Sequence, residues 1–223
     1  MLQLLGLLVW ALVAATAATR TALQCPGTAH LQEIPPATAA AAAASRPEFP
    51  SRKLTLEGWV WLMDGTAGLL SYSIDTGDGG NETVEFSAVA EAAGGLTVVL
   101  RGVETSLRGP DVIGRGQWTH VAVVWDTNTG SLRGFVDSRP QGESLFEASV
   151  FIPPGGTIRV AAGAHVSGNT GRVERFVPIG TGNSVVELRL WSAIFLEKEL
   201  RQSLMLSPDP LVALERQGGA RTA

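Results

Sequence analysis

Short apolar segments alternate with polar, turn-forming residues along this chain, and the clearest case runs from Gly116 to Asp137. An apolar segment bounded by two tryptophans is followed there by polar residues up to Gly130 and then by a second apolar segment. Aromatic and β-branched side chains favour strands, whereas Asp, Asn and Gly favour chain reversal. The pattern predicts a β-hairpin whose second strand ends at the turn containing Pro140, because proline cannot donate a ladder hydrogen bond.

Comparable segments recur at short intervals, which is typical of an all-β sandwich. Besides the two strands of that hairpin, at 118–125 and 132–137, we expect strands at 21–25, 30–34, 54–62, 68–74, 83–90, 96–103, 149–152, 157–162 and 185–191. Only 195–205 has helical periodicity, with apolar residues on one side and charged residues on the other. We therefore predict an all-β fold with one short C-terminal helix.

The length and composition agree with a single sandwich domain. A chain of 223 residues can form one sandwich, and 26 glycines with 12 prolines indicate many turns. We place this domain at 18–206, with a low-complexity loop insertion at 37–52 and a flexible tail at 207–223. A net charge of −4 excludes the basic surface that nucleic acid requires. Cys25 is the only cysteine, so it is either a small buried hydrophobe or a link to another chain.

The N-terminus carries an apolar segment over residues 1–17 that ends in small residues. This pattern is typical of a secretory signal peptide, so we expect a secreted protein with no membrane span after cleavage. An uncleaved signal anchor, which would tether the protein to a membrane, is the alternative because no basic residues precede the apolar segment. Asn81 begins an Asn-Glu-Thr sequon, which in an exported chain predicts a glycosylated surface loop.

Several short motifs follow one another in a characteristic order. They are Ala22–Cys25 and His30–Pro35, then Leu54–Val60, Gly116–Asp126, Gly134–Asp137 and Val186–Trp191. In this order the chain resembles laminin G-like and pentraxin-like domains of the concanavalin A-like lectin/glucanase superfamily, over about residues 21–205. The resemblance implies a jelly roll of two antiparallel sheets.

The similarity to pentraxins in particular is partial. Residues similar to those of pentraxins stand at Leu69–Ser73, Asn81, Glu82 and His120. Pentraxins, however, have a disulfide that joins the position of Ala122 to the strand near Glu57 and Gly58, and this chain has no cysteine at either place. Pentraxins also bind calcium partly through an acidic run where this chain has 163–168, which contains no acidic residue. These departures weaken the inference of a pentraxin-like ring.

A partial calcium site is the metal centre that the sequence suggests. Its ligands would be Asp75, Asp78, Asn81 and Glu82, which offer side-chain oxygens within one loop. Calcium takes about six to eight oxygen ligands, so further ligands would have to come from elsewhere, and a glycan on Asn81 would remove its amide from the site. The alternative is a solvated turn, in which Asp and Asn stabilise the chain reversal.

A catalytic site of the glucanase kind is not expected. Retaining glycosidases place two carboxylates about 5 Å apart, and the Glu-x-Asp-x-x-Glu and Glu-x-Asp-x-Glu signatures of the family are missing from this chain. Glu82 and Glu85 would face opposite sides of a regular strand, and Glu187 is the only carboxylate in its strand. His120 is most simply a packed strand residue.

The strand at 54–62 offers a candidate binding face. Its odd-numbered residues include Trp59 and Trp61, and the strand at 185–191 places Glu187, Arg189 and Trp191 on one face. Exposed indoles beside charged groups would suit a sugar, through stacking and charge-assisted hydrogen bonds. The alternative is that both sheet faces are covered and the indoles pack in the interior.

These features predict a secreted, non-catalytic recognition module that binds a glycan or a glycosylated surface. A protein-binding adhesion or scaffold module is the first alternative, and a diverged glycoside hydrolase is the second. A concave face with open indoles would favour a sugar, a flat apolar patch a protein, and two close carboxylates hydrolysis.

Overall fold

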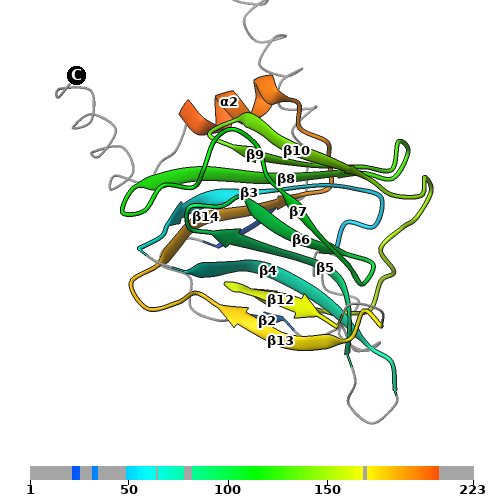
Figure 1. Ribbon diagram of the computed structural model, residues 1–223. Helices are drawn as coiled ribbons and strands as arrows, with labels where there is room; N and C mark the ends of the chain where they lie inside the picture. Colours follow the sequence, from blue (N-terminus) through cyan, green and yellow to red (C-terminus); the bar gives the residue numbers. More distant parts are fainter. Residues whose placement is uncertain are drawn as a thin grey trace, which may run out of the picture.

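The computed structural model of this chain describes residues 22–25, 32–34, 49–63, 65–77, 82–167 and 170–205. In this part of the chain, two six-stranded antiparallel sheets pack face to face, together with a two-stranded hairpin and one helix (Figure 1). The expected all-β, two-sheet sandwich with a short C-terminal helix is confirmed. The expected signal peptide at 1–17 and the tail at 207–223 lie outside the described residues, as do Asp78 and Asn81.

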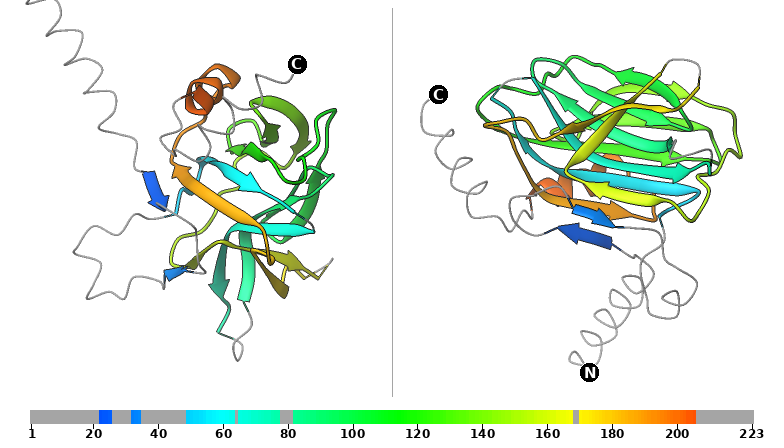
Figure 2. Two further views of the ribbon diagram at one scale, coloured as in Figure 1. Left: turned by 90° about the vertical axis from the view of Figure 1, so that its left-hand side faces the viewer. Right: turned by 90° about the horizontal axis from the view of Figure 1, so that it is seen from below.

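Each sheet is built from strands that are distant in sequence. The first sheet contains, in spatial order, β1 (Ala22–Cys25), β14 (Ser184–Trp191), β3 (Lys53–Trp61), β8 (Trp118–Asp126), β9 (Ser131–Val136) and β10 (Arg139–Leu145). The second contains β2 (Gln32–Ile34), β11 (Thr157–Val160), β4 (Thr66–Asp75), β5 (Glu82–Glu91), β6 (Leu96–Leu100) and β7 (Val103–Leu107). The hairpin of β12 (Ala162–Val166) and β13 (Val173–Pro178) and the helix α2 (Glu197–Met205) lie on opposite outer sides of the sandwich (Figure 2).

Apolar side chains fill the space between the two sheets. Trp125 and Phe86 are fully buried there, and Phe49 stacks on Tyr72 with ring centroids 4.3 Å apart. The Tyr72 hydroxyl donates to the carbonyl of Pro153 at 2.8 Å, so its polar end is satisfied at the edge of the core. Phe49 belongs to the segment expected as a loop insertion, so the end of that segment contributes to the core.

The outer face of the first sheet is also covered. Helix α2 packs its buried Leu200 against Ala122, Val124 and Phe135, and the segment before the helix is fixed by a side chain of β3. The Thr55 hydroxyl donates to the carbonyl of Ala193 at 2.8 Å and accepts from the Phe195 N–H at 3.0 Å. Strand β3 is therefore buried on both faces.

A β-bulge changes the alternation of β14. Val186 pairs with Trp59 and Arg189 pairs with Glu57, so two residues of β14 stand opposite Gly58 alone. Glu187 adopts a positive φ of 52° at this point. As a result Leu188 faces the core between the sheets, and Arg189 faces outward beneath α2.

The outer face of the second sheet is covered by the β12–β13 hairpin, which packs on β4 and β5. Contact is close because Gly68 has no side chain: a Cβ there would lie 1.9 Å from the carbonyl oxygen of Val177 and 2.0 Å from the nitrogen of Gly163. Ser87 joins the layers, since its hydroxyl accepts from the N–H of Ala164 and donates to the carbonyl of the same residue.

Several predicted strand boundaries are wrong. The segment 96–103 is the hairpin β6–β7 rather than one strand, because Arg101 and Gly102 both take a positive φ and form a two-residue turn. The segment 157–162 is likewise not one strand. It contains β11 and the first residue of β12, and Ala161 between them has a φ of 61°. No strand forms at 149–152.

Pro140 does not end the ladder as expected. It lies within β10, an edge strand, where a residue without an N–H is tolerated on the side that faces away from the sheet. Strands β10 and β13 were not predicted at all. Among the described residues, no helix is long and apolar enough to cross a membrane.

Candidate functional site

The residues expected to form a ligand-binding face lie on the outer face of the first sheet, but Trp59 and Glu187 are buried and Trp61, Arg189 and Trp191 are only half-exposed. Trp59 is 2% exposed, it packs with Val186, and Leu204 of α2 lies against the same pair. Its ring also meets the imidazole of His120 edge-on, with centroids 5.2 Å apart. The packing alternative therefore holds for Trp59, which offers no open face to a sugar.

Glu57, which sequence reasoning did not single out as a site, lies at the centre of this buried cluster. Its carboxylate accepts a hydrogen bond of 3.0 Å from Trp191 Nε1 and lies 3.5 Å from His120 Nε2. Arg189 lies 3.8 Å from the same carboxylate and donates to Glu187 at 3.1 Å. Burial raises the pKa of Glu57, but the neighbouring His120 and hydrogen bonds from Ser203 and Trp191 outweigh it and hold the pKa below its ordinary value.

Two of the expected calcium ligands are described, and Glu82 is already engaged. Arg159 donates to both of its carboxylate oxygens at 2.7 Å, and the Ser73 hydroxyl donates at 2.6 Å. Burial raises the pKa of Glu82, but the bonds from Arg159 and Ser73 and the Arg159 charge together hold the pKa below its ordinary value. Asp75 is exposed and accepts from the N–H of Gly77 at 2.8 Å, as in a solvated turn.

No cluster of three or more His, Cys, Asp or Glu side chains suited to a metal occurs within the ranges that the structure describes. The remaining strand carboxylate, Glu85, pairs with Arg101 at 2.7 Å. Burial raises its pKa, and the charge and hydrogen bond of Arg101 offset only part of that effect. Glu57, Glu82 and Glu85 are therefore each held by neighbouring side chains.

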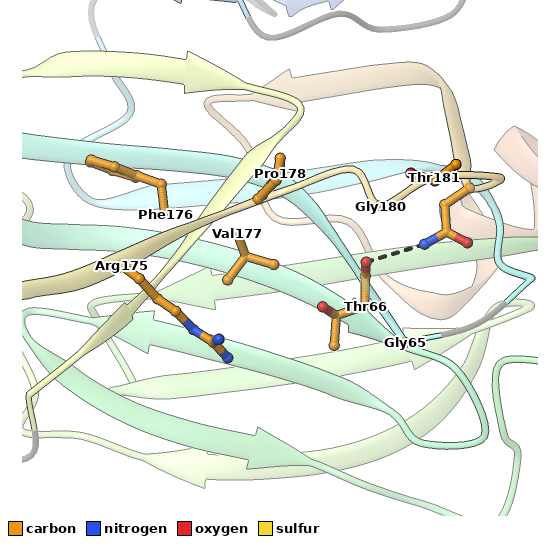
Figure 3. Close-up of a pocket in the computed structure, with 9 residues that line it drawn as sticks. Gly65, Thr66, Arg175, Phe176, Val177, Pro178, Gly180 and Thr181 are labelled. Carbon is orange, nitrogen blue, oxygen red and sulfur yellow. Dashed lines mark hydrogen bonds between the residues drawn. The ribbon is translucent and has the colours of Figure 1, made fainter.

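An open groove lies at one end of the sandwich, between the start of β4, the strand β13 and the loop that leads to β14 (Figure 3). Its volume is about 380 Å³. We call it the end groove, and it is lined by Gly65, Thr66, Arg175, Phe176, Val177, Pro178, Gly180, Thr181 and Asn183. Its polar side chains are hydroxyls, one amide and one guanidinium.

Asn183 fixes the end of the groove that is nearest to β14. Its amide donates to the carbonyl of Thr66 at 3.2 Å, and its side-chain oxygen accepts from the N–H of Met63 at 2.9 Å. Gly65 and Gly182 take φ values of 66° and 79°, which let the two loops turn tightly on either side. The amide therefore ties the loop before β14 to the turn between β3 and β4.

Arg175 is the charged residue of the groove. Figure 3 shows its side chain with that of Val177 on one side of β13, and those of Phe176 and Pro178 on the other. Arg175 is exposed, and within the described residues its guanidinium forms no ion pair or hydrogen bond. Phe176, by contrast, lies against Arg159, whose guanidinium carbon is 4.4 Å from its ring centroid.

Sequence reasoning missed every residue of the end groove. No strand was expected over β13, because its apolar residues are few and its neighbours are polar. Thr66 and Asn183 belong to turns, where polar residues are common and carry no separate signal. Arg175 lies on a strand that was not predicted, so its place in the groove could be found only from the fold.

A pair of half-buried indoles, Trp61 and Trp118, is the second feature with open aromatic surface. The two residues face each other across β3 and β8, with ring centroids 5.8 Å apart and planes at 60°. They lie beside the Trp59 cluster on the outer face of the first sheet. Trp191 is also half-buried, but its ring packs against Phe195 at 5.3 Å.

A laminin G family model, described as the Concanavalin A-like lectin/glucanases superfamily, matches residues 36–177. The chain belongs to this superfamily. The resemblance inferred from the motifs is thereby confirmed. Glu57 and Ala122, at the positions where pentraxins have the disulfide, are direct partners across β3 and β8. A comparison with curated protein sequences found no match.

Several solved structures are similar in fold to this chain. A native heptameric SAP-like pentraxin from Limulus polyphemus matches with a TM-score of 0.51 and 18% identity, over 78% of this chain and 81% of that chain. A Trypanosoma rangeli sialidase matches with a TM-score of 0.44 and 14% identity, over 69% of this chain and 22% of the sialidase. Botulinum neurotoxin type C, whose cell entry depends on two ganglioside molecules, matches with a TM-score of 0.47 and 10% identity, over 83% of this chain and 46% of the toxin chain.

Proposed function

We propose that this chain is a secreted, non-catalytic glycan-recognition module, and that the end groove binds an acidic sugar residue. One observation carries the proposal: the Arg175 guanidinium, without a carboxylate partner in the described part of the chain, stands over an open groove lined by hydroxyl and amide groups. A guanidinium pairs with a carboxylate or sulfate through two parallel hydrogen bonds. The hydroxyls of Thr66 and Thr181 supply further hydrogen-bonding groups for sugar hydroxyls.

The size of the groove is consistent with this ligand. Its volume of about 380 Å³ lies at the lower end of the range of small-molecule sites, which suits one terminal sugar rather than a long chain. Its open shape also suits a residue at the end of a glycan, because the rest of the chain can extend into solvent. Trp61 and Trp118 stay a second candidate surface for sugar stacking.

The absence of catalysis is part of the proposal and is supported by the carboxylates. No Asp or Glu lies among the described residues that line the end groove. Glu82 and Glu85, the carboxylates considered for hydrolysis, are each paired with an arginine. Most retaining glycosidases, sialidases excepted, need two free carboxylates about 5 Å apart beside the sugar, one of them ready to act as nucleophile.

A glycan array followed by calorimetry tests this function. We expect the intact chain to bind acidic glycans with and without a calcium chelator, because the described part of the calcium loop holds Glu82 in a pair with Arg159. Loss of binding in chelator would instead support the calcium site at Asp75 to Glu82.

The variant Arg175→Gln identifies the groove as the site. We expect it to weaken binding of the strongest acidic glycan by about tenfold or more, because a charge-assisted pair is lost. Arg172→Gln, which removes the same charge from an exposed position nearby, should bind like the wild type. Equal affinity in the wild type and Arg175→Gln, or an array on which no acidic glycan binds, would contradict the proposal.

A further inference from the structure

A second cavity, of about 430 Å³, lies on the outer face of the first sheet, where β9 and β10 run beside the start of α2. We call it the hairpin pocket, and its lining includes Arg133, Phe135, Pro140, Glu143 and Glu197. It shares no residue with the end groove, so an inference about it does not depend on the function proposed above.

Arg133 is the unusual member of this pocket. The residue is half-buried, and its guanidinium carbon lies 5.9 Å from the centroid of the Phe135 ring. Its Nε atom is buried and has no hydrogen-bond partner, and the residue forms no ion pair within the described part of the chain. A buried N–H without an acceptor costs free energy, and such groups in native structures are commonly satisfied by a bound water, ion or ligand.

The acidic residues of the pocket form no ion pair with Arg133. Glu143 is the cross-strand partner of Arg133, but its carboxylate accepts a hydrogen bond from the Ser131 hydroxyl. Glu197 pairs with Arg201 one turn further along α2. Neither carboxylate forms an ion pair with Arg133, so its guanidinium has no carboxylate acceptor among the residues that the structure describes.

We propose that the hairpin pocket binds a small organic acid, whose carboxylate pairs with Arg133 and whose apolar body lies against Phe135 and Pro140. A guanidinium can hold a carboxylate through two parallel hydrogen bonds. The aromatic ring and the proline add the apolar contact that small-molecule sites usually provide, and the volume lies within the range of such sites.

Calorimetry with 3-phenylpropionate as the probe tests the site on the full chain. The matched compound is 3-phenylpropanol, which has the same apolar body and no charge. We expect saturable binding of the acid to the wild type, and affinity lower by about tenfold or more for the alcohol and for Arg133→Gln. Arg139→Gln, an exposed arginine of the same β9–β10 hairpin, should bind the acid like the wild type.

A chemical footprint on the wild type keeps the test independent of the folding of any variant. Phenylglyoxal modification, read by mass spectrometry, should slow at Arg133 but not at Arg139 when the probe is added. Absence of saturable binding, equal affinity for acid and alcohol, or unchanged modification of Arg133 at saturating probe would overturn the proposal.

Discussion

Trp125 has the largest of the fully buried side chains between the two sheets. Its ring meets that of Phe146 edge-on, with centroids 5.8 Å apart. We expect Trp125→Ala to lower the free energy of unfolding by about 3–5 kcal/mol, because it removes a large buried ring and leaves a cavity. Chemical denaturation measures the change. Trp61→Ala, at a half-buried ring, should cost clearly less, and a Trp125→Ala variant as stable as the wild type would contradict this placement of β8.

Glu57 makes stability depend on pH. Its folded pKa lies below the ordinary value of 4.5, so its contribution to stability is present above that value and is lost as the pH falls through the folded pKa. We expect the free energy of unfolding to decrease below about pH 4.5, and Glu57→Gln to show less of that decrease. At pH 7 the variant should be less stable by about 1–3 kcal/mol, because His120 and Arg189 lose their charged neighbour.

Denaturation midpoints measured between pH 3 and pH 7 check this expectation. Glu104→Gln is a suitable control, because Glu104 is an exposed carboxylate whose partner, His165, lies outside the buried cluster. Identical pH profiles for the wild type and Glu57→Gln would show that the buried carboxylate does not couple folding to protonation.

The β12–β13 hairpin is the element on which the end groove depends, because β13 provides Arg175. Gly68 lets the hairpin approach β4 closely, and a Cβ at this position would overlap backbone atoms of Val177 and Gly163. We expect Gly68→Ala to displace the hairpin and to cost about 1–3 kcal/mol or more. Hydrogen exchange should speed up at 162–166 and 173–178 but not in the β8–β9 hairpin, and unchanged exchange in β12–β13 would contradict the packing.

Alternation along the sequence was enough to predict most central strands but not what covers them. In β3 the alternation correctly placed Leu56 and Trp59 on opposite faces of the sheet. It could not show that α2 lies over Trp59, because the cover comes from residues far along the chain. The bulge at Glu187 was equally hidden, since a positive φ at a glutamate leaves no pattern in the sequence.

The candidate site was the least predictable part. The expected ligand-binding residues came from strands with strong periodicity, and such strands tend to be buried on both sides in a sandwich with extra layers. Arg175 instead lies on a strand with a weak pattern, and Arg133 is a polar position of a strand that was predicted. Both are singled out because they have no ion-pair partner among the described residues. Partners across sheets and loops are set by the tertiary fold, so the sequence alone could not single out either arginine.

At the scale of the whole molecule, both outer faces of the sandwich carry a further layer. Helix α2 covers part of the first sheet and β12–β13 covers part of the second, as Figures 1 and 2 show. The end of the sandwich between β4, β13 and β14 has an open groove, in which Arg175 forms no ion pair with any residue that the structure describes. This arrangement supports recognition at an end rather than on a sheet face.

Mapping of the bound glycan by NMR tests this central claim most directly. The isotope-labelled chain is titrated with the strongest acidic glycan from the array, and with its neutral parent as the control. We expect shifts of the backbone amides of Thr66, Arg175 and Asn183 with the acidic glycan, and much smaller shifts with the neutral one. Shifts confined to other residues, or equal shifts with both glycans, would contradict a groove that recognises an acidic sugar through Arg175.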